Sequence, residues 1–249
     1  MRKELIASLS MLGSLAASGA AAAQTCATPP SCETLGFTKS ETDCDGLEAL
    51  KCPFDQSKLY CPQGGGNMSA AAPGAILYSD GTISDSVIAS KTPVGIVAYV
   101  NGSTGFAVAL TESNQTWGGY GYNVSCLGDM DSGAASADMN GRVNTQCLVS
   151  DSQTHPAANY CNTFSAVSSG KGSSGWYLPA AGELKAMSYS YGAINLGLQK
   201  LSKTQISSNY YWSSSEGGNY LAWDVRPSDG YVDYYYKSNS GRVRCVLAL

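Results

Sequence analysis

The feature that most constrains the fold is the C-terminal stretch 210–249, in which strand-like runs recur at intervals of about ten residues. Each run is rich in Tyr, Trp, Val and Ser, and turn-forming Gly, Pro, Asn and Asp lie between the runs. This spacing predicts a β meander. The predicted strands are Tyr211–Ser215, Tyr220–Arg226, Tyr231–Lys237 and Arg242–Leu249.

Alternation along these strands predicts one face that packs on the core and one that faces solvent. The residues predicted on the core side are Leu221, Trp223, Val225, Val232, Tyr234 and Tyr236. The opposite face combines Tyr with Asp, Arg, Asn and Ser, a composition typical of antibody binding loops. The alternative is a plain solvated face that carries Tyr because Tyr favours strands.

If the exposed face binds a ligand, its contact residues should be those that project from the strands and their turns. The predicted contacts are Tyr220, Asp224, Arg226, Tyr231, Asp233, Tyr235, Lys237 and Asn239.

The N-terminus, 1–23, reads as a secretory signal peptide: a basic start, a short apolar stretch and small residues before Gln24. The apolar stretch is too short and too rich in Ala, Ser and Gly for a membrane span. Thr25 before Cys26 argues against lipidation, which favours a small Gly or Ala there. We therefore expect a secreted protein, located in the periplasm or at the cell surface, without direct membrane insertion.

Composition supports an extracellular β protein. Only 14% of residues are charged, Gly is abundant at 28 residues, and the formal net charge is −4. No basic run occurs, which argues against a nucleic-acid partner.

The nine cysteines together with export indicate disulfides. Five of them lie in 24–62, a segment too short for a core of its own and therefore predicted to be a disulfide-stapled module. The spacings and the lack of a nearby His disfavour zinc. The odd count leaves one thiol free or paired with another chain, so oligomerisation stays open. A Gly- and Ala-rich linker, 63–73, leads to the main domain, 74–249.

Within the main domain the sequence predicts a strand at Ile76–Tyr78, a hairpin formed by Val94–Val100 and Phe106–Leu110, and short helices. The helices are expected at Ala157–Phe164, just after Pro179, and at Ile194–Leu201. The segment 113–175 is otherwise polar and rich in Gly and Ser.

Two features in that segment are candidate chemical sites. Oxygen ligands for calcium would come from Asp129, Asp131, Asp138 and Asn140, but their spacing does not match an EF-hand and such residues mostly form turns. His155, the only histidine, would have to serve any Ser-His-Asp or Cys-His unit, and no nucleophile elbow accompanies it. We expect no enzyme activity, and no cofactor or metal beyond weakly supported calcium.

Several motifs in a fixed order resemble a known family: ILYSDGTIS, TPVGIVAYV, DMNGRVNT, GWYLPAAGEL, YWSSSE and VRCV. This series is similar to the C-terminal domain of the Legionella collagen-like adhesin and to Fibrobacter succinogenes major-domain proteins, over about 74–249. The resemblance implies an α+β, C-type-lectin-like fold with antiparallel sheets, two or three short helices and a C-terminal meander.

The resemblance also bears on cysteines and ligands. It implies disulfides Cys161–Cys245 and Cys126–Cys147. The EPN, QPD and WND motifs of calcium-dependent lectins are absent, so calcium-dependent sugar binding is not implied. The adhesin's affinity for sulfated polysaccharides calls for a basic surface, which a pI near 4.9 disfavours.

The C-terminal stretch is also similar to the variable receptors of diversity-generating retroelements, in which scaffold residues alternate with diversified ones. Here the scaffold would be Trp212, Ser213, Ser214, Trp223, Gly230, Arg244 and Cys245. The sequence thus predicts a secreted or surface-displayed binding protein, an adhesin or variable receptor, for a glycan or protein ligand. The alternatives are a structural or fimbria-like subunit and, less favoured, a polysaccharide-active enzyme.

Overall fold

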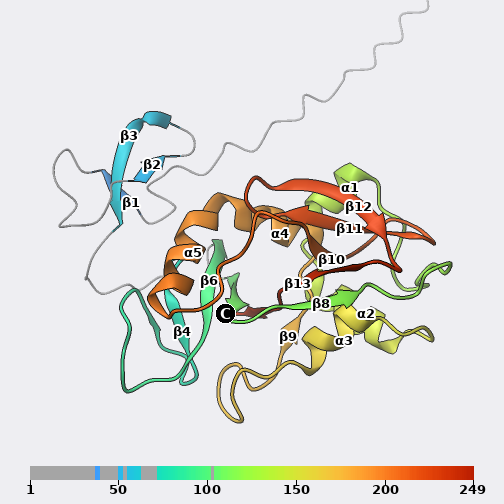
Figure 1. Cartoon of the computed structure of the whole chain (residues 1–249), viewed down its shortest axis with the longest axis horizontal. Helices are drawn as coiled ribbons and strands as arrows, with labels where there is room; N and C mark the ends of the chain where they lie inside the picture. Colours follow the sequence, from blue (N-terminus) through green and yellow to red (C-terminus); the bar gives the residue numbers. More distant parts are fainter. Residues whose placement is uncertain (1–36, 40–49, 53–54, 63–71, 102–103) are drawn as a thin grey trace, which may run out of the picture. The chain divides into compact units, whose positions relative to one another are not determined.

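A computed structural model describes residues 37–39, 50–52, 55–62, 72–101 and 104–249 of the 249-residue chain (Figure 1). The predicted signal peptide and most of the predicted linker lie outside the described residues, and so do the cysteine side chains of the 24–62 module. What is described of that module is a small antiparallel sheet of strand order β1-β3-β2, formed by Phe37–Lys39, Asp55–Pro62 and Leu50–Cys52.

The main domain is α+β with antiparallel sheets and short helices, so the predicted fold class is confirmed. Its strands are β4 (Ile76–Tyr78), β5 (Ile83–Ser84), β6 (Pro93–Asn101), β7 (Thr104–Ala109), β8 (Ser113–Thr116), β9 (Trp176–Tyr177), β10 (Tyr211–Glu216), β11 (Leu221–Arg226), β12 (Tyr231–Tyr236), β13 (Ser240–Val243) and β14 (Val246–Ala248). Its helices are α1 (Ser132–Ala137), α2 (Gly141–Ser150), α3 (Pro156–Thr163), α4 (Ala181–Met187), the 3-10 turn η1 (Ser188–Ser190) and α5 (Tyr191–Lys200).

Helices α1 and α2 lie in a segment for which the sequence predicted no helix ahead of α3. Neither has the apolar periodicity that identifies an amphipathic helix. The Asp131 side chain caps α1 by accepting from the Ala134 N–H, and α2 buries Asn144 and Thr145 along with Leu148. Polar side chains thus occupy positions at which sequence-based prediction of a helix requires apolar residues.

Two sheets form the main domain. One has the order β5-β4-β6-β7-β14-β9, with every neighbouring pair antiparallel. The other has the order β12-β11-β10-β13-β8. The first three of these strands form the predicted meander and lie side by side in Figure 1.

The fourth predicted strand, Arg242–Leu249, is corrected by the structure. Instead of one strand following β12, there are two strands in different sheets: β13 pairs in parallel with β10, and β14 pairs with β7 and β9. The break falls at Arg244 and Cys245. Arg244 is buried, donates to the carbonyls of Ala109 (2.9 Å) and Thr204 (3.0 Å), and pairs with Glu112 (3.1 Å), so its side chain is held by segments other than β13 and β14.

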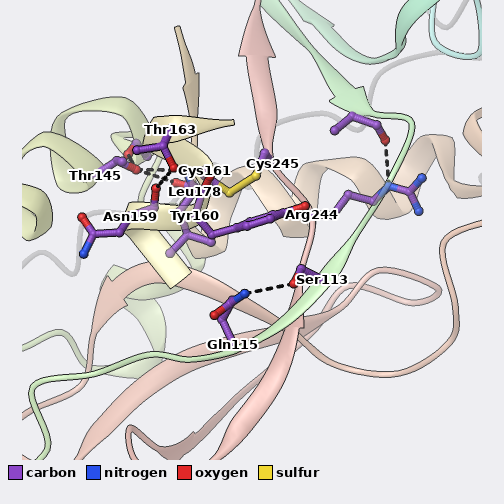
Figure 2. Close-up of a disulfide and its surroundings, with 12 residues drawn as sticks. Ser113, Gln115, Thr145, Asn159, Tyr160, Cys161, Thr163, Leu178, Arg244 and Cys245 are labelled. Atoms are coloured by element: carbon purple, nitrogen blue, oxygen red, sulfur yellow. Dashed lines mark hydrogen bonds between the residues drawn. A yellow bond between two sulfur atoms is a disulfide. The ribbon is translucent and has the colours of Figure 1, made fainter. Parts of the chain in front are cut away.

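Both of the disulfides that the family resemblance implied are present in the structure. Cys161 of α3 is joined to Cys245 at the break between β13 and β14, with Cα atoms 5.2 Å apart (Figure 2). Cys126 is joined to Cys147 of α2, with Cα atoms 5.9 Å apart. The first bridge fixes the point at which the chain passes from one sheet to the other.

The core of the main domain consists of two apolar clusters. One contains residues of α4 and α5, such as Leu184 and Leu198, packed with Trp223 and Val225 of β11. The other contains residues of α2 and α3, including Leu148, packed with strand residues of both sheets. In the part of the chain that the structure describes, no helix is long and apolar enough to cross a membrane.

Candidate ligand-binding surface

Strand β10, the YWSSSE motif, is buried at all six positions although four of them are polar. Two of its three serines have internal partners: Ser213 Oγ donates to the Trp223 carbonyl (2.6 Å), and Ser215 Oγ donates to Asp138 Oδ2 (2.6 Å). The buried Ser214 Oγ has no hydrogen-bond partner among the described residues. The Trp212 indole N–H donates to the carbonyl of Gln115 (3.1 Å). Buried polar groups are stable when they are paired in this way, so the motif is a rigid support for the strands beside it.

The pairing of β11 with β12 assembles most of the predicted contact residues. Asp224 lies opposite Asp233, Arg226 opposite Tyr231, and Ala222 opposite Tyr235. Directly opposed residues of antiparallel strands project from the same face. Five of the eight predicted contacts therefore share one face, which we call the platform: Asp224, Arg226, Tyr231, Asp233 and Tyr235.

An open cleft of about 430 Å³ lies along the platform. Its walls come from β8, the segment before β10, and strands β10 to β13. The lining residues are Asn114, Asn209, Tyr210, Trp212, Asp224, Asp233, Tyr234, Tyr235, Ser240, Gly241 and Arg242.

The predicted contacts did not include Asn114, Asn209, Tyr210 or Arg242, which also line this cleft. Tyr210 directly precedes the first predicted strand, so its position in the sequence could have identified it as a candidate contact residue. Asn114 could not be identified in this way, because it reaches the cleft only through the pairing of β8 with β13, where it lies opposite Arg242.

The carboxyl of Asp224 is the most unusual group in the cleft. The residue is only 8% exposed, and its Oδ1 has no hydrogen-bond partner among the described residues. Burial, and secondarily the facing charge of Asp233, raise the pKa of Asp224 to about 7. This carboxyl therefore loses its proton at a much higher pH than an ordinary aspartate.

The two arginines nearby already have anionic partners. Arg226 pairs with Asp229 at 2.6 Å, and its guanidinium lies 5.5 Å from the ring centroid of Tyr210 and 5.4 Å from that of Tyr231. Arg242 pairs with Glu112 at 2.6 Å. Glu112 also pairs with Arg244 at 3.1 Å, so this one carboxylate serves two arginines.

The prediction that Lys237 contacts a ligand is wrong. The side chain is fully buried, and its ammonium pairs with Glu216, donates to the Tyr122 carbonyl (2.8 Å) and lies 4.7 Å from the Trp117 ring centroid. A lysine at a strand end is predicted to be exposed unless its partner is known. The buried partner here, Glu216, comes from another strand and cannot be identified from the local sequence.

Tyr220 and Asn239, the other two predicted contacts, do not line the cleft. Tyr220 is exposed and packs edge-on against Tyr120, with ring centroids 5.1 Å apart, and the ring centroid of Tyr236 is 6.5 Å from that of Tyr120. Asn239 belongs to the β12–β13 turn, where its N–H donates to the Tyr236 carbonyl.

Tyr234 and Tyr236 were predicted on the core side, but they are 55% and 54% exposed. Strand β12 is the edge of its sheet. On this face Val232 packs against the core, while the Tyr234 ring meets the core residue Trp223 edge-on with centroids 5.7 Å apart. Alternation assigned the correct face, but the core does not extend under the outer end of the strand.

The calcium candidates have structural partners. Asp131 caps α1, and the buried Asp138 accepts from Asn144 Nδ2 (2.8 Å), Ser215 Oγ and the Asn140 N–H. In the described ranges no group of three His, Cys, Asp or Glu side chains could hold a metal ion.

His155 lies immediately before α3, as predicted, and is fully buried. Its Nε2 is 3.0 Å from Asp151 Oδ2, and its ring meets Trp117 edge-on. The hydrogen bond to His155 lowers the pKa of Asp151. The histidine therefore has structural contacts and does not open onto the cleft.

The fold and the platform define a domain of the C-type-lectin-like class. The model of the Lcl C-terminal domain family matches residues 122–247, half of the chain, and the chain belongs to this family. The family resemblance stated from the motifs is thus confirmed.

The structure is also similar to that of a fimbrial protein from Bacteroides ovatus, with a TM-score of 0.53 and 19% identity. The match covers 70% of this chain and 48% of the fimbrial protein, so the chain spans about half of that protein's length. This likeness concerns the fold. No curated protein matches the chain.

Proposed function

We propose that this chain is a secreted or surface-displayed binding protein of the adhesin type, which recognises an external glycan or protein through the platform and its cleft. The observation that carries the proposal is the contrast at the platform: Tyr231 and Tyr235 are about half exposed, and they lie opposite β11, a strand that is buried at its four central positions. Rigid aromatic side chains on such a support lose little entropy when they bind.

Membership of the Lcl C-terminal domain family supports the proposal. The platform supplies what recognition needs: phenol rings for stacking, and carboxyl, amide and guanidinium groups for directional hydrogen bonds. We propose binding without catalysis, since the only histidine is buried away from the cleft and the cleft is open to solvent.

A fimbria-like structural subunit is the second candidate, and the shared fold with a fimbrial protein favours it. A subunit of this kind should assemble into polymers, and the odd cysteine would provide a covalent link. Size-exclusion chromatography and non-reducing gels of the exported protein separate the two candidates, because a receptor of the adhesin type does not need to polymerise.

The direct test is to screen the full exported chain against glycan and host-protein arrays and then to replace Tyr231 and Tyr235 together by Ala. We expect binding to be lost while Tm changes by less than about 2 °C, since exposed side chains contribute little to stability. Tyr122→Ala is the matched control: Tyr122 is exposed and does not line the cleft.

A large fall in Tm of the double variant would show that these tyrosines belong to the core. Unchanged binding by a stable double variant would rule out the platform as the binding surface.

A further inference from the structure

We infer that the cleft binds the cationic end of a lysine or arginine side chain, presented by a partner protein, between Asp224 and Asp233. The inference rests on the proposed function and specifies the ligand chemistry of the same surface.

The first observation is a pair of carboxyls without a cation. Asp224 and Asp233 lie directly opposite each other on β11 and β12, and neither forms an ion pair within the described residues. Like charges at directly opposed positions of a sheet are destabilising. A bound cation converts this repulsion into two attractions.

The second observation is the unpartnered acceptor. Asp224 is more than nine-tenths buried, lines the cleft, and has a buried Oδ1 without a hydrogen-bond donor. A buried acceptor left unpaired is costly. An ammonium or guanidinium brings several donors and a charge, and charge-assisted hydrogen bonds to a carboxylate are the strong ones.

The cations of the protein itself do not meet this need. Arg226 pairs with Asp229, and Arg242, which lines the cleft, pairs with Glu112. Glu112 is shared with Arg244, whereas Asp224 and Asp233 have no ion-pair partner among the described residues. The formal net charge of the chain is also negative. This balance favours a cationic ligand over a sulfated or other anionic one.

The aromatic walls suit the same ligand. Tyr210, Trp212 and Tyr235 line the cleft, and aromatic ring faces attract ammonium and guanidinium groups. Arg226 already shows such a contact, with its guanidinium 5.5 Å from the ring centroid of Tyr210 and 5.4 Å from that of Tyr231. The aliphatic part of a Lys or Arg side chain can lie along these rings while its charged end reaches the carboxyls.

A neutral sugar could also donate hydroxyl groups to these carboxyls and stack on the rings. It would leave the two like charges without compensation, so the basic side chain fits the described groups better. Binding of a neutral sugar is therefore one of the outcomes that the experiment distinguishes.

The experiment is an NMR titration of the isotopically labelled full exported chain with the peptide acetyl-Gly-Ser-Lys-Ser-Gly-amide and its arginine counterpart. Matched probes carry Nε-acetyl-lysine or norleucine at the central position. We expect saturable shifts of cleft residues with the two basic peptides and none with the neutral ones. Asp224→Asn and Asp233→Asn should each weaken binding about tenfold, whereas Asp85→Asn, in the loop after β5, should not.

Binding should also weaken as the pH is lowered from 8 to 5, because Asp224 then takes up a proton. The charged and titratable groups around Asp224 are Asp233 and Tyr235 of β12, Arg226 of its own strand, Tyr210 and Arg242. The pKa of Asp224, which burial raises to about 7, falls inside this interval.

Equal binding of the acetyl-lysine peptide, or no binding of either basic peptide at millimolar concentration, would overturn the inference. So would a neutral oligosaccharide that occupies the cleft and is insensitive to Asp224→Asn. If an array ligand still depends on Tyr231 and Tyr235 in those cases, the proposed function stands without the cation. If no ligand depends on these tyrosines, the proposed function fails and the inference fails with it.

Discussion

Strands β10 and β12 of one sheet invert the usual relation between polarity and burial. Strand β10, with sequence YWSSSE, is buried along its whole length, whereas β12, with sequence YVDYYY, is largely exposed. The serines and the glutamate of β10 all lie inside the protein, and the four tyrosines of β12 all lie at its surface.

Position in the sheet explains the inversion. Strand β10 has neighbours on both sides, β11 and β13, while β12 is the edge strand. A central strand brings each polar side chain within reach of partners from several segments, as Ser215 reaches Asp138. An edge strand at the limit of the core has no such surroundings, so large aromatic side chains remain available to a ligand. The scaffold and the recognition surface are thus separated strand by strand.

The largest expected effect comes from breaking the buried pair at the end of β10. Lys237→Ala leaves the Glu216 carboxylate buried without its cation, and loss of one member of such a pair costs about 3–5 kcal/mol of unfolding free energy. Urea unfolding at pH 7 measures this loss. Lys203→Ala, at an exposed position, is the control, and a loss below about 1 kcal/mol for Lys237→Ala would contradict the buried pair.

The next effect concerns the serines of β10. Ser215→Ala removes the donor to Asp138 Oδ2 and the acceptor of the Ala181 N–H, two buried groups that then lack a partner. We expect a loss of about 1–3 kcal/mol. Denaturant unfolding compares it with Ser238→Ala in the exposed turn after β12, and an equal effect of the two changes would remove the distinction between the strands.

The pH dependence of stability tests the Asp224 carboxyl, which is buried although it lines the cleft. The raised pKa of Asp224 means that the folded protein keeps a proton which the unfolded chain releases between pH of about 4 and about 7. Stability from this group is therefore present at low pH and falls as the pH rises through that window. The wild type should lose about 1–3 kcal/mol more than Asp224→Asn between pH 4 and pH 8.

Unfolding titrations at several pH values measure this difference. Asp85→Asn is the control and should follow the wild type. Parallel curves for wild type and Asp224→Asn would mean that the carboxyl is better solvated than its burial indicates.

A smaller effect is expected on the outer end of β12. Tyr236→Ser should change the unfolding free energy by less than about 0.5 kcal/mol, because the ring is 54% exposed and its ring contact is a loose one with Tyr120, at 6.5 Å between centroids. A thermal melt suffices. A fall of several degrees would show that the edge strand carries part of the core.

The final prediction involves no change in stability. If the chain is a variable receptor, sequencing the 3′ end of the gene across many cells should find substitutions at outward positions such as Tyr231, Asp233 and Tyr235. Trp212 and the serines of β10 should stay constant, because all of them are buried and Trp212, Ser213 and Ser215 donate internal hydrogen bonds. Substitutions spread evenly over both strands would contradict diversification, and an invariant stretch would indicate one fixed ligand.

Much of the fold could be predicted from local signals. Turn residues at regular spacing located β10, β11 and β12 within one or two residues of their bounds, and alternation placed Asp224, Arg226, Tyr231, Asp233 and Tyr235 on a common face. Helices α3, α4 and α5 were likewise placed near Pro156, Pro179 and Ile194.

The misses share one physical cause. The burial of Lys237 depends on Glu216, the division of the last strand depends on Arg244 reaching Ala109, and the cleft depends on Asn114 arriving beside Arg242. Each involves a partner distant in the sequence, and no local propensity or periodicity encodes such a partner.

The sequence by itself thus determined the strand pattern, the face on which ligand-facing side chains gather, and the family to which the chain belongs. Only the tertiary structure decided which of those side chains are free to bind. Strand pattern follows from the conformational preferences of neighbouring residues, whereas burial and pairing follow from contacts between segments that only folding brings together. The carboxyl of Asp224 illustrates the difference: its place on the platform followed from alternation, and its buried, unpartnered state from the packing around it.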